Sequence, residues 1–450
     1  MKVSKFGGTS LADAAQIRKV CDIVLSDPKR RLVVVSAPGK RHKGDTKVTD
    51  LLIACAEAHL RNGSAEKELQ AVVTRYADIA RDLGLSGDVA KRIADDIRGR
   101  LATPTTDRGR FIDTMKAAGE DNAAWLVAAY LQSTGVEARY VSPREAGLLV
   151  SHEFGNAQVL PESYRNLARL GDAPGITIFP GFFGYSPAGA VVTFPRGGSD
   201  ITGSILAAAV KAEVYENFTD VDSVFVANPN LVPSPRPITE LTYREMRELS
   251  YAGFSVFHEE ALAPVFRAGV PVCIKNTNNP SAPGTRIVMD RVCPLGSVAG
   301  IACGDGFCAV YLSKYLMNRE AGFGRRLLQI LEEEGLSYEH APSGIDNISV
   351  ILRAREFTPA KEAAVVDRIR RDLQADDVTV ERGLALVMIV GERMRNAVGL
   401  AARATKAFAS AGVNIEMINQ GSSEVSMMFG VKAADMAKAV KALYQEFFGA

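Results

Sequence analysis

The chain has 450 residues, of which 47% are hydrophobic and 23% are charged. This composition is typical of a folded protein of about three domains, and it excludes disordered, collagen-like and coiled-coil proteins. The 53 Lys and Arg residues nearly balance the 52 Asp and Glu residues, so no overall charge attracts nucleic acid or an anionic membrane. We therefore expect small-molecule partners, no nucleic acid and no membrane, with any anion site built locally.

The longest uncharged stretch, Ala173–Pro195, contains four prolines and reads as strands and turns rather than a membrane helix. The amino-terminal residues have no apolar run of the kind that a secretory signal needs, so we expect a cytoplasmic protein. The six cysteines form no CxxC pair and are expected to be free thiols. No metal-binding cluster is expected, and the glycosylation-like triplet at Asn217 is set aside because it matters only in a secreted protein.

Short apolar runs alternate with helical patterns up to about Asp290. The expected strands are Leu32–Ser36, Ala138–Val141, Ile176–Phe179, Val191–Phe194, Ala212–Phe218 and Val270–Ile274. The expected helices are Leu11–Ser26, Val48–Leu60, Gly119–Ser133, Ser199–Val210, Thr242–Tyr251 and Glu259–Ala268. This alternation predicts an α/β fold with an open, mostly parallel sheet between two layers of helices.

A repeat follows the expected linker Arg291–Gly296. Moving Gly335–Glu339 forward by 77 residues places it on Gly412–Glu416, and the same offset aligns apolar helix positions. Each copy reads as a small α+β unit of about 70 residues, which is too short to bury much core alone. We expect the two copies to pack side by side and against another chain.

Two Gly-Gly turns precede helical patterns, and each carries a cation. The first is Lys5–Ser10 and the second is Arg196–Asp200. Glycines allow backbone N–H groups to approach phosphate closely, and the following helix adds a positive end. Each turn alone is compatible with an ordinary turn or a capped helix start, whereas the pair favours a site where two anions meet. Neither is a Walker A loop, since GxxxxGK[ST] is absent.

Three further groups follow expected strands or open a helix. Thr219–Asp222 follows a strand, where open α/β sheets bind ligands, and suggests ribose or Mg-nucleotide contacts, with solvated turn carboxylates as the alternative. Ser36–Pro38 with the later Thr46–Asp50 also leaves a strand end. Gly119-Glu120 opens an expected helix, where a buried Glu could meet an ammonium group.

These motifs, KFGGTS, VVVSAP with VTDLL, GE, RGGSD and TDVD, resemble aspartokinase in order and over essentially the whole chain. The length resembles the monofunctional form of the family. The resemblance implies an amino-acid-kinase fold over residues 1–290, followed by two α+β ACT (ferredoxin-like) domains. The ACT domains are expected at 314–382 and, interleaved with it, at 296–313 plus 383–450.

The resemblance implies transfer of the γ-phosphoryl group of MgATP to the side-chain carboxylate of L-aspartate. An ionised carboxylate needs no catalytic base, which agrees with the lack of a His or Cys motif. Lys5, Gly7 and Gly8 would neutralise the phosphoryl group, and Asp200 would orient Lys5. Four residues would bind aspartate. They are Arg196 on its α-carboxylate, Glu120 on its ammonium group, and Thr49 and Ser199 through hydrogen bonds.

The resemblance also implies contacts to ATP from Thr219, Asp220 and Phe225. Here the chain departs from the commoner pattern, since Asn228 and Asn230 stand where many members have an acidic and a basic residue. The phosphate-side contact falls on Asn230, and the missing basic residue is replaced either by Lys275 or by the loop that contains Asn278 and Asn279. The expected cofactors are ATP and Mg2+.

An amino-acid effector is expected in the ACT pair, with L-lysine as the first choice and L-threonine as the alternative. The expected effector residues are Met317, Gly322, Ser337, Glu339, Ser343, Asp346, Asn414 and Glu424. The alternative for Met317 is an ordinary apolar helix face. Two other functions stay open at this point: an acetylglutamate or glutamate kinase of the same fold, and a non-catalytic amino-acid sensor. A homodimer formed through the ACT domains is expected.

Overall fold

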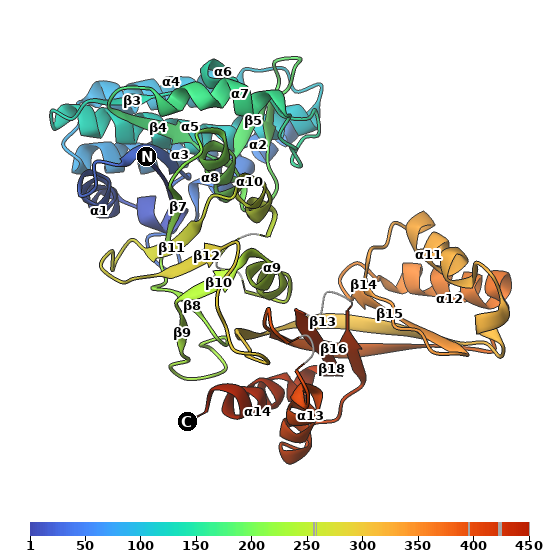
Figure 1. Ribbon diagram of the computed structural model, residues 1–450. Helices are drawn as coiled ribbons and strands as arrows, with labels where there is room; N and C mark the ends of the chain where they lie inside the picture. Colours follow the sequence, from blue (N-terminus) through green and yellow to red (C-terminus); the bar gives the residue numbers. More distant parts are fainter. Residues whose placement is uncertain (255–256, 258, 395–396, 422–424, 450) are drawn as a thin grey trace. The chain divides into compact units, whose positions relative to one another are not determined.

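The computed structural model describes residues 1–450 except 255–256, 258, 395–396, 422–424 and 450 (Figure 1). The chain forms two compact units, which are described separately. The first unit comprises Met1–Val224, Pro237–Arg247 and Ser255–Arg291. The second unit comprises Phe225–Arg236, Glu248–Phe254 and Val292–Ala450.

The first unit is built on an eight-stranded sheet with the order β10-β12-β11-β7-β1-β2-β4-β3. Every neighbouring pair is parallel except β11 with β12. Four consecutive residues of β2, 32–35, are fully buried, so both faces of the sheet are covered. The predicted mostly parallel α/β sheet is confirmed. The strands are β1 (Lys2–Phe6), β2 (Arg30–Val35), β3 (Ala138–Tyr140), β4 (Ile176–Pro180), β7 (Val214–Thr219), β10 (Glu240–Thr242), β11 (Val272–Asn276) and β12 (Thr285–Val288).

Helices cover the faces of this sheet (Figure 1). The helices of this unit are α1 (Ala14–Leu25), α2 (Val48–Asn62), α3 (Glu66–Asp82), α4 (Gly87–Leu101), α5 (Arg108–Ser133), α6 (Pro143–Ala146), α7 (Glu162–Ala168), α8 (Gly198–Ala209) and α10 (Leu262–Ala268), and the residues of α9 (Tyr243–Tyr251) are divided between the two units. Short pieces are the 3-10 turns η1 (Gly8–Leu11), η2 (Arg169–Gly171) and η3 (Glu259–Ala261), and the strands β5 (Phe183–Tyr185), β6 (Val191–Thr193), β8 (Val224–Phe225) and β9 (Pro237–Ile238).

Several predicted helix boundaries were wrong. The first helix begins at Ala14 rather than Leu11, because the Asp13 side chain accepts a hydrogen bond from Gln16 N at 2.9 Å and caps it there. The helix expected from Gly119 is the second half of α5, whose cap is Asp107, and α3 and α4 were not predicted. Capping fixes where a helix starts, whereas the apolar period alone leaves the start open.

The second unit is built on a six-stranded antiparallel sheet with the order β14-β15-β13-β16-β18-β17. Its strands are β13 (Gly300–Ser313), β14 (Tyr338–His340), β15 (Asn347–Arg353), β16 (Asp377–Val390), β17 (Met417–Gln420) and β18 (Ser426–Lys432). One apolar cluster packs under α11 (Phe323–Glu333) and α12 (Pro359–Leu373), and a second packs under α13 (Leu400–Ser410) and α14 (Met436–Phe448). The short turns are η4 (Met317–Arg319) and η5 (Ala433–Asp435).

The predicted repeat is visible in this unit. The 77-residue offset carries α11 onto α13 from end to end, since Phe323 maps to Leu400 and Glu333 to Ser410. Strands β13 and β16 run through both halves of the sheet, with a register shift between Gly304 and Phe307. The two copies of the repeat therefore share one sheet. Each copy thereby has the other as a packing partner, which a domain of this size lacks alone.

All six cysteines are free thiols, and Cys21, Cys55, Cys293 and Cys308 are buried. Burial raises the pKa of the Cys55 thiol to about 11. No helix among the described residues is both long and apolar enough to span a membrane.

Candidate active site

The two loops that leave β1 and β2 pack backbone to backbone at the carboxyl end of the parallel sheet. Gly7 N donates to Phe218 O at 3.2 Å, and Gly39 N donates to Gly8 O at 2.8 Å. A Cβ atom on Gly39 would lie 2.5 Å from Gly8 C, and one on Gly8 would lie 3.0 Å from Ala37 O. Only glycine permits this approach. The pair of loops lies where open α/β sheets bind ligands.

Lys5 lies beneath these loops near the end of β1 and is 8% exposed. Its Nζ is 2.5 Å from Asp200 Oδ1 on α8, and the same oxygen accepts from Asn217 Nδ2 at 2.9 Å. Tyr215 OH donates to the backbone oxygen of Asp200 at 3.1 Å. The ammonium group is thus held by a carboxylate that is itself anchored from β7. The structure brings Lys5, Gly7, Gly8 and Asp200 together.

The second Gly-Gly turn begins α8. Gly197 has φ of 83°, and a Cβ atom on Gly198 would lie 2.5 Å from the ring of Phe182. Phe182 itself has φ of 75°, which is unusual for a bulky residue, and its N–H is held by Thr202 Oγ1 at 3.0 Å. The turn therefore admits only glycine at both positions. It lies against a strained segment, of the kind that clusters at functional sites.

Two predicted aspartate contacts flank this turn. Ser199 is buried, and its Oγ would lie 2.6 Å from a Cβ atom on Gly181, so it packs tightly against the loop after β4. Arg196 is exposed, and among the described residues it forms no ion pair. Its guanidinium group is therefore available for an anion from solution.

Glu120 is buried in the middle of α5 and is 5% exposed. Burial raises its pKa to about 8, and the neighbouring Asp121 adds to the shift, while Lys5 and the Ala37 backbone oppose it. Its Oε2 has no hydrogen-bond partner in the described part of the chain. The preceding Gly119 allows α5 to lie close to the β2 loop, because a Cβ atom there would lie 2.8 Å from Ala37 Cβ. Glu120 thus has unused capacity for a cationic partner.

The remaining predicted aspartate contact, Thr49, is half-buried in the first turn of α2. This turn is tied to the β2 loop, since Val48 N donates to Pro38 O at 3.0 Å. Thr49 and Glu120 therefore approach the same loop from two helices.

A second group of predicted residues lies at the ends of β7 and β11, the strands next to β1. Thr219 ends β7, and its backbone oxygen accepts from Thr277 N at 2.9 Å. Asp222 Oδ1 accepts from Asn276 Nδ2 at 2.7 Å, whereas Asp220 is exposed. Lys275 lies opposite Phe218 in the sheet register. The structure brings Thr219, Asp220 and Lys275 to one edge of the sheet.

The last three predicted nucleotide contacts lie in different parts of the chain's fold. Asn278 is exposed and accepts from Gln16 Nε2 at 3.1 Å and from Lys19 Nζ at 3.0 Å, both on α1. Phe225 and Asn230 belong to the segment Phe225–Arg236 of the second unit. The placement of these two side chains in the site stays a prediction.

Asn217 and Phe182 were missed by the sequence analysis. Asn217 was considered only as a glycosylation triplet, yet it is 1% exposed and holds Asp200. An amide inside an apolar strand was a usable signal, because buried polar groups need partners. Phe182 offered no signal, since backbone strain cannot be inferred from residue type.

The predicted effector residues lie in the second unit and fall into three groups. Met317 is 7% exposed in the apolar cluster under α11, which is the structural alternative raised for it, and Gly322 precedes α11 with φ of 78°. Asp346 Oδ1 accepts from Leu316 N at 2.9 Å, so its turn lies beside Met317. Ser343 in the same turn is exposed.

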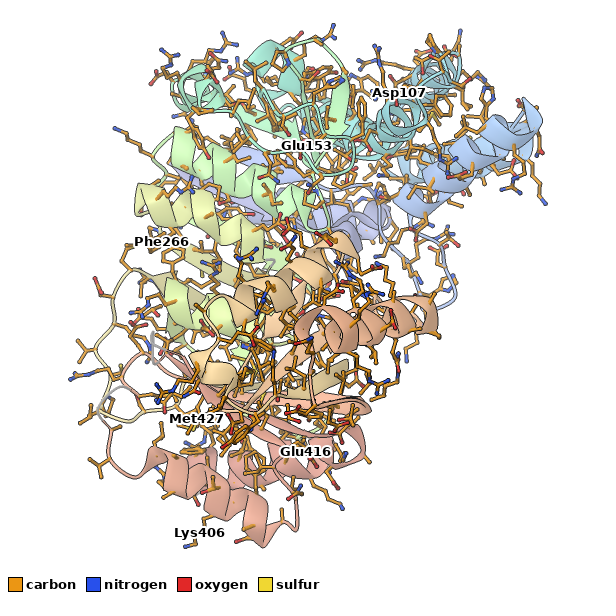
Figure 2. All side chains as sticks on the ribbon, turned by 90° about the vertical axis from the view of Figure 1, so that its right-hand side faces the viewer. Asp107, Glu153, Phe266, Lys406, Glu416 and Met427 are labelled. Carbon is orange, nitrogen blue, oxygen red and sulfur yellow. The ribbon has the colours of Figure 1, made fainter. Side chains whose placement is uncertain are left out.

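The second group belongs to β14 and its approach, where Ser337 is exposed. Glu339 accepts from Arg353 Nε at 2.6 Å and from Tyr251 OH, so its carboxylate already has partners. The third group is Asn414, which donates to Glu416 Oε1 at 3.0 Å. Glu416 is labelled in Figure 2. Glu424 lies outside the described residues. The effector assignments stay predictions.

Comparisons with known proteins agree with this architecture. The sequence pattern of the amino acid kinase family matches residues 1–276, and that of the ACT domain matches residues 387–447. The chain is 62% identical over 448 residues to Aspartokinase 3 of Bacillus subtilis (strain 168), covering 100% of this chain and 99% of that relative.

Solved structures give the same result. The crystal structure of the aspartate kinase from Clostridium acetobutylicum has a TM-score of 0.88 and 37% identity, covering 99% of this chain and 100% of that one. E. coli aspartokinase III in complex with aspartate and ADP has a TM-score of 0.81 and 27% identity, covering 100% of both chains. Its complex with lysine and aspartate has a TM-score of 0.78 and 26% identity, covering 100% of this chain and 99% of that one. The chain belongs to the aspartokinases, within the amino acid kinase family.

Proposed function

We propose that the chain catalyses the transfer of the γ-phosphoryl group of MgATP to the side-chain carboxylate of L-aspartate, giving 4-phospho-L-aspartate and ADP. The observation that carries this proposal is the buried Lys5, held by Asp200 under two glycine loops at the carboxyl end of the sheet. The complex of E. coli aspartokinase III with aspartate and ADP supports the same substrates.

In the proposed reaction an aspartate carboxylate oxygen forms a bond to the γ-phosphorus as the bond from that phosphorus to the ADP oxygen breaks. The nucleophile is already an anion, so no proton leaves it. Catalysis then consists of positioning and of neutralising the charge on the phosphoryl oxygens. Lys5 and the amides of Gly7 and Gly8 supply that positive charge, and Asp200 keeps Lys5 in place.

Aspartate is held by its α-carboxylate on Arg196 and by its ammonium group on Glu120, with hydrogen bonds from Thr49 and Ser199. Among the described residues, the exposed Arg196 forms no ion pair and Glu120 Oε2 has no hydrogen-bond partner, which supports this assignment. Because the pKa of Glu120 is raised to about 8, the empty site carries a protonated Glu120 at neutral pH. An arriving ammonium group favours the ionised form, so Glu120 loses its proton as aspartate binds.

The nucleotide is assigned to Thr219, Asp220, Phe225, Asn230, Lys275 and Asn278. Mg2+ in phosphoryl-transfer sites is usually held by one or two carboxylates together with substrate phosphates and waters. Asp220 and Asp222 at the end of β7 fit that requirement, since both are exposed. When bound, Mg2+ supplies charge neutralisation of the triphosphate.

We assign feedback control to the second unit, with L-lysine as the effector and L-threonine as the alternative. The domains are assigned as 1–290 for catalysis, 314–382 for the first ACT domain, and 296–313 plus 383–450 for the second. The two apolar clusters support the boundary at 382/383, whereas Cys308, Val310 and Leu312 pack in the cluster under α11 and α12. E. coli aspartokinase III in complex with lysine supports the effector.

We further assign a homodimer formed through the ACT domains. The end strands of the six-stranded sheet, β14 and β17, carry the half-exposed side chains Tyr338 and Ile418. Strands at a sheet edge present unpaired backbone groups that a second chain can use. Light scattering after size-exclusion chromatography checks the expected mass of two chains.

The function is tested by ATP-dependent acyl phosphate formation, trapped with hydroxylamine, on aspartate, glutamate and N-acetylglutamate. We expect turnover of aspartate only, and suppression by lysine. Turnover that neither lysine nor threonine affects would contradict the effector assignment and leave the kinase standing. No aspartate turnover by folded protein would contradict the proposed reaction.

A further inference from the structure

The segment between β2 and α2 contacts the glycine turn of the active site but has little structure of its own. Residues 39–47 form no helix or strand, and 40–44 are exposed. The segment begins at Gly39, whose backbone packs against Gly8. It also carries the exposed cations Lys40, Arg41 and Lys43. Such a segment presents Gly39 in one place only if something else holds it.

Arg75 on α3 holds this segment from below. It is 4% exposed, although it is an arginine on a helix whose other buried positions are mostly apolar. Its Nη1 is 2.6 Å from Asp45 Oδ2, and its Nη2 donates to Gly39 O at 2.6 Å. One guanidinium group therefore fixes both ends of the segment 39–45.

The same guanidinium group also reaches the other glycine loop. Arg75 Nη2 donates to Ala12 O at 3.2 Å, and Ala12 follows the 3-10 turn that starts at Gly8. Arg75 thus links Ala12, which follows the Gly7-Gly8 turn, to Gly39, which packs against that turn. Hydrogen bonds from Arg41 and Arg75 hold the pKa of Asp45 well below its usual value, so the ion pair persists at neutral pH.

Stability alone is a poor explanation for this arginine. Arg75 is buried with one carboxylate, and its Nε has no hydrogen-bond partner within the residues that the structure describes. Taking such a pair out of water is costly, and apolar residues of similar volume are often as stable or more stable in its place. The planar guanidinium group of Arg75 binds two backbone carbonyls and one carboxylate at once, so it is suited to fixing the positions of these groups relative to one another.

We propose that Arg75 is a positioning residue for phosphoryl transfer, which clamps segment 39–45 against the Gly7-Gly8 turn and so keeps that turn in its reactive geometry. This inference rests on the proposed function, because it assigns the turn to the transferred phosphoryl group. Arg75 touches no substrate in this proposal and acts through Gly39 and Ala12.

The test compares Arg75→Met and Arg75→Lys with Arg30→Lys. Arg30 is the matched control, since it is also a buried arginine, with Nε 2.7 Å and Nη2 3.0 Å from the Glu216 carboxylate at the other end of the sheet. We expect Arg75→Met to lower kcat by about 10- to 100-fold, because small misplacements at a reacting centre cost that much. The KM for aspartate should change little, since Glu120 and Arg196 are untouched. The kcat of Arg75→Lys should lie between those of the wild type and Arg75→Met, and Arg30→Lys should keep the wild-type kcat.

Unchanged kcat in folded Arg75→Met would overturn the proposal, as would equal losses of kcat in the Arg75 and Arg30 variants. If Arg75→Met does not fold, the double variant Arg75→Met with Asp45→Asn leaves no unpaired buried charge and takes its place. Gly39→Ala keeps Arg75 but forces a Cβ atom to within 2.5 Å of Gly8 C, so it should give the same loss confined to kcat. A KM-only effect in Gly39→Ala would also contradict the clamp.

The proposed function and the clamp fail in different ways in this experiment. Aspartate turnover by the wild type tests the function. The clamp is tested by the ratio of kcat between the Arg75 variants and Arg30→Lys. This ratio is measured with the carboxylate substrate that the wild type phosphorylates, whichever substrate that is.

Discussion

The two ends of the central strands β1, β2 and β7 differ in how completely the charged groups near them are paired. At the amino end, Glu216 accepts from Ser4 Oγ at 2.9 Å and from Arg30 Nε at 2.7 Å, with Lys2 at 3.7 Å. At the carboxyl end, Glu120 has an unpartnered oxygen and Arg196 forms no ion pair among the described residues. Ser4 and Lys5 are neighbours in β1, and because successive side chains of a strand point to opposite faces of the sheet, Ser4 contacts Glu216 whereas Lys5 contacts Asp200.

This difference in pairing suggests that one end of the strands stabilises the fold and that the other end binds ligands. A buried carboxylate with several donors keeps its charge at little cost, whereas one without a partner is protonated or waits for a ligand. The saturated end is therefore expected to carry stability, and the unsaturated end to carry substrates. The predictions below test this division, beginning with the largest effect.

Lys5→Met should have the largest effect on activity. Removing the charge that faces the phosphoryl group should lower kcat by about 100- to 1,000-fold, as for other preorganised electrostatic groups. The hydroxylamine trap measures kcat, and Lys2→Met at the amino end of the same strand is the control. Comparable losses in the two variants would contradict the division of the strand into two roles.

Arg30→Met should have the largest effect on stability. It removes the guanidinium group that donates two hydrogen bonds to the buried Glu216 carboxylate. Breaking a buried ion pair by removing one partner typically lowers the free energy of unfolding by about 3–5 kcal/mol. Urea unfolding should show the loss, while kcat per folded molecule stays at the wild-type value. A variant that is stable but slow would place Arg30 in the catalytic machinery and contradict the comparison.

Glu120→Gln should raise the KM for aspartate by about 10- to 100-fold with a smaller change in kcat, because it removes a charged partner of the ammonium group. It should also change how stability depends on pH. The pKa of Glu120 is raised from 4.5 to about 8 in the fold, so the folded state binds the extra proton between these values. Its contribution to stability is therefore present below pH 4.5 and is lost as pH rises through 8.

Denaturant unfolding of the wild type and Glu120→Gln across this pH range measures that effect. The wild type should lose stability relative to the variant as pH rises. Parallel pH profiles would show that Glu120 is ionised in the empty site and contradict its proposed state.

Aspartate binding should release about one proton per site at pH 7, because a group with a pKa of about 8 is mostly protonated there and becomes ionised beside the ammonium group. Calorimetry in buffers of different ionisation enthalpy measures this number, and it should fall toward zero above pH 9. Glu120→Gln is the control. Release that persists in that variant would assign the proton to another group.

The sequence by itself predicted the parallel sheet, the two glycine turns, the residues Lys5 and Asp200, and the 77-residue repeat. These features are local: strands and helices follow from the period of apolar residues, and a Gly-Gly turn follows from two neighbouring residues. It placed helix starts wrongly, as at Leu11 and Gly119, and it did not predict α3 and α4, because the apolar period alone identifies neither caps nor every surface helix.

The family resemblance implied that Asp200 orients Lys5, and the tertiary structure decided the other contacts. It showed that Asn217 on β7 holds Asp200 on α8, and that Arg75 on α3 joins Ala12 to Gly39. The raised pKa of Glu120 likewise depends on burial by helices and loops distant in the chain. Pairing and desolvation are properties of the packed interior, so residue types and their spacing do not determine them.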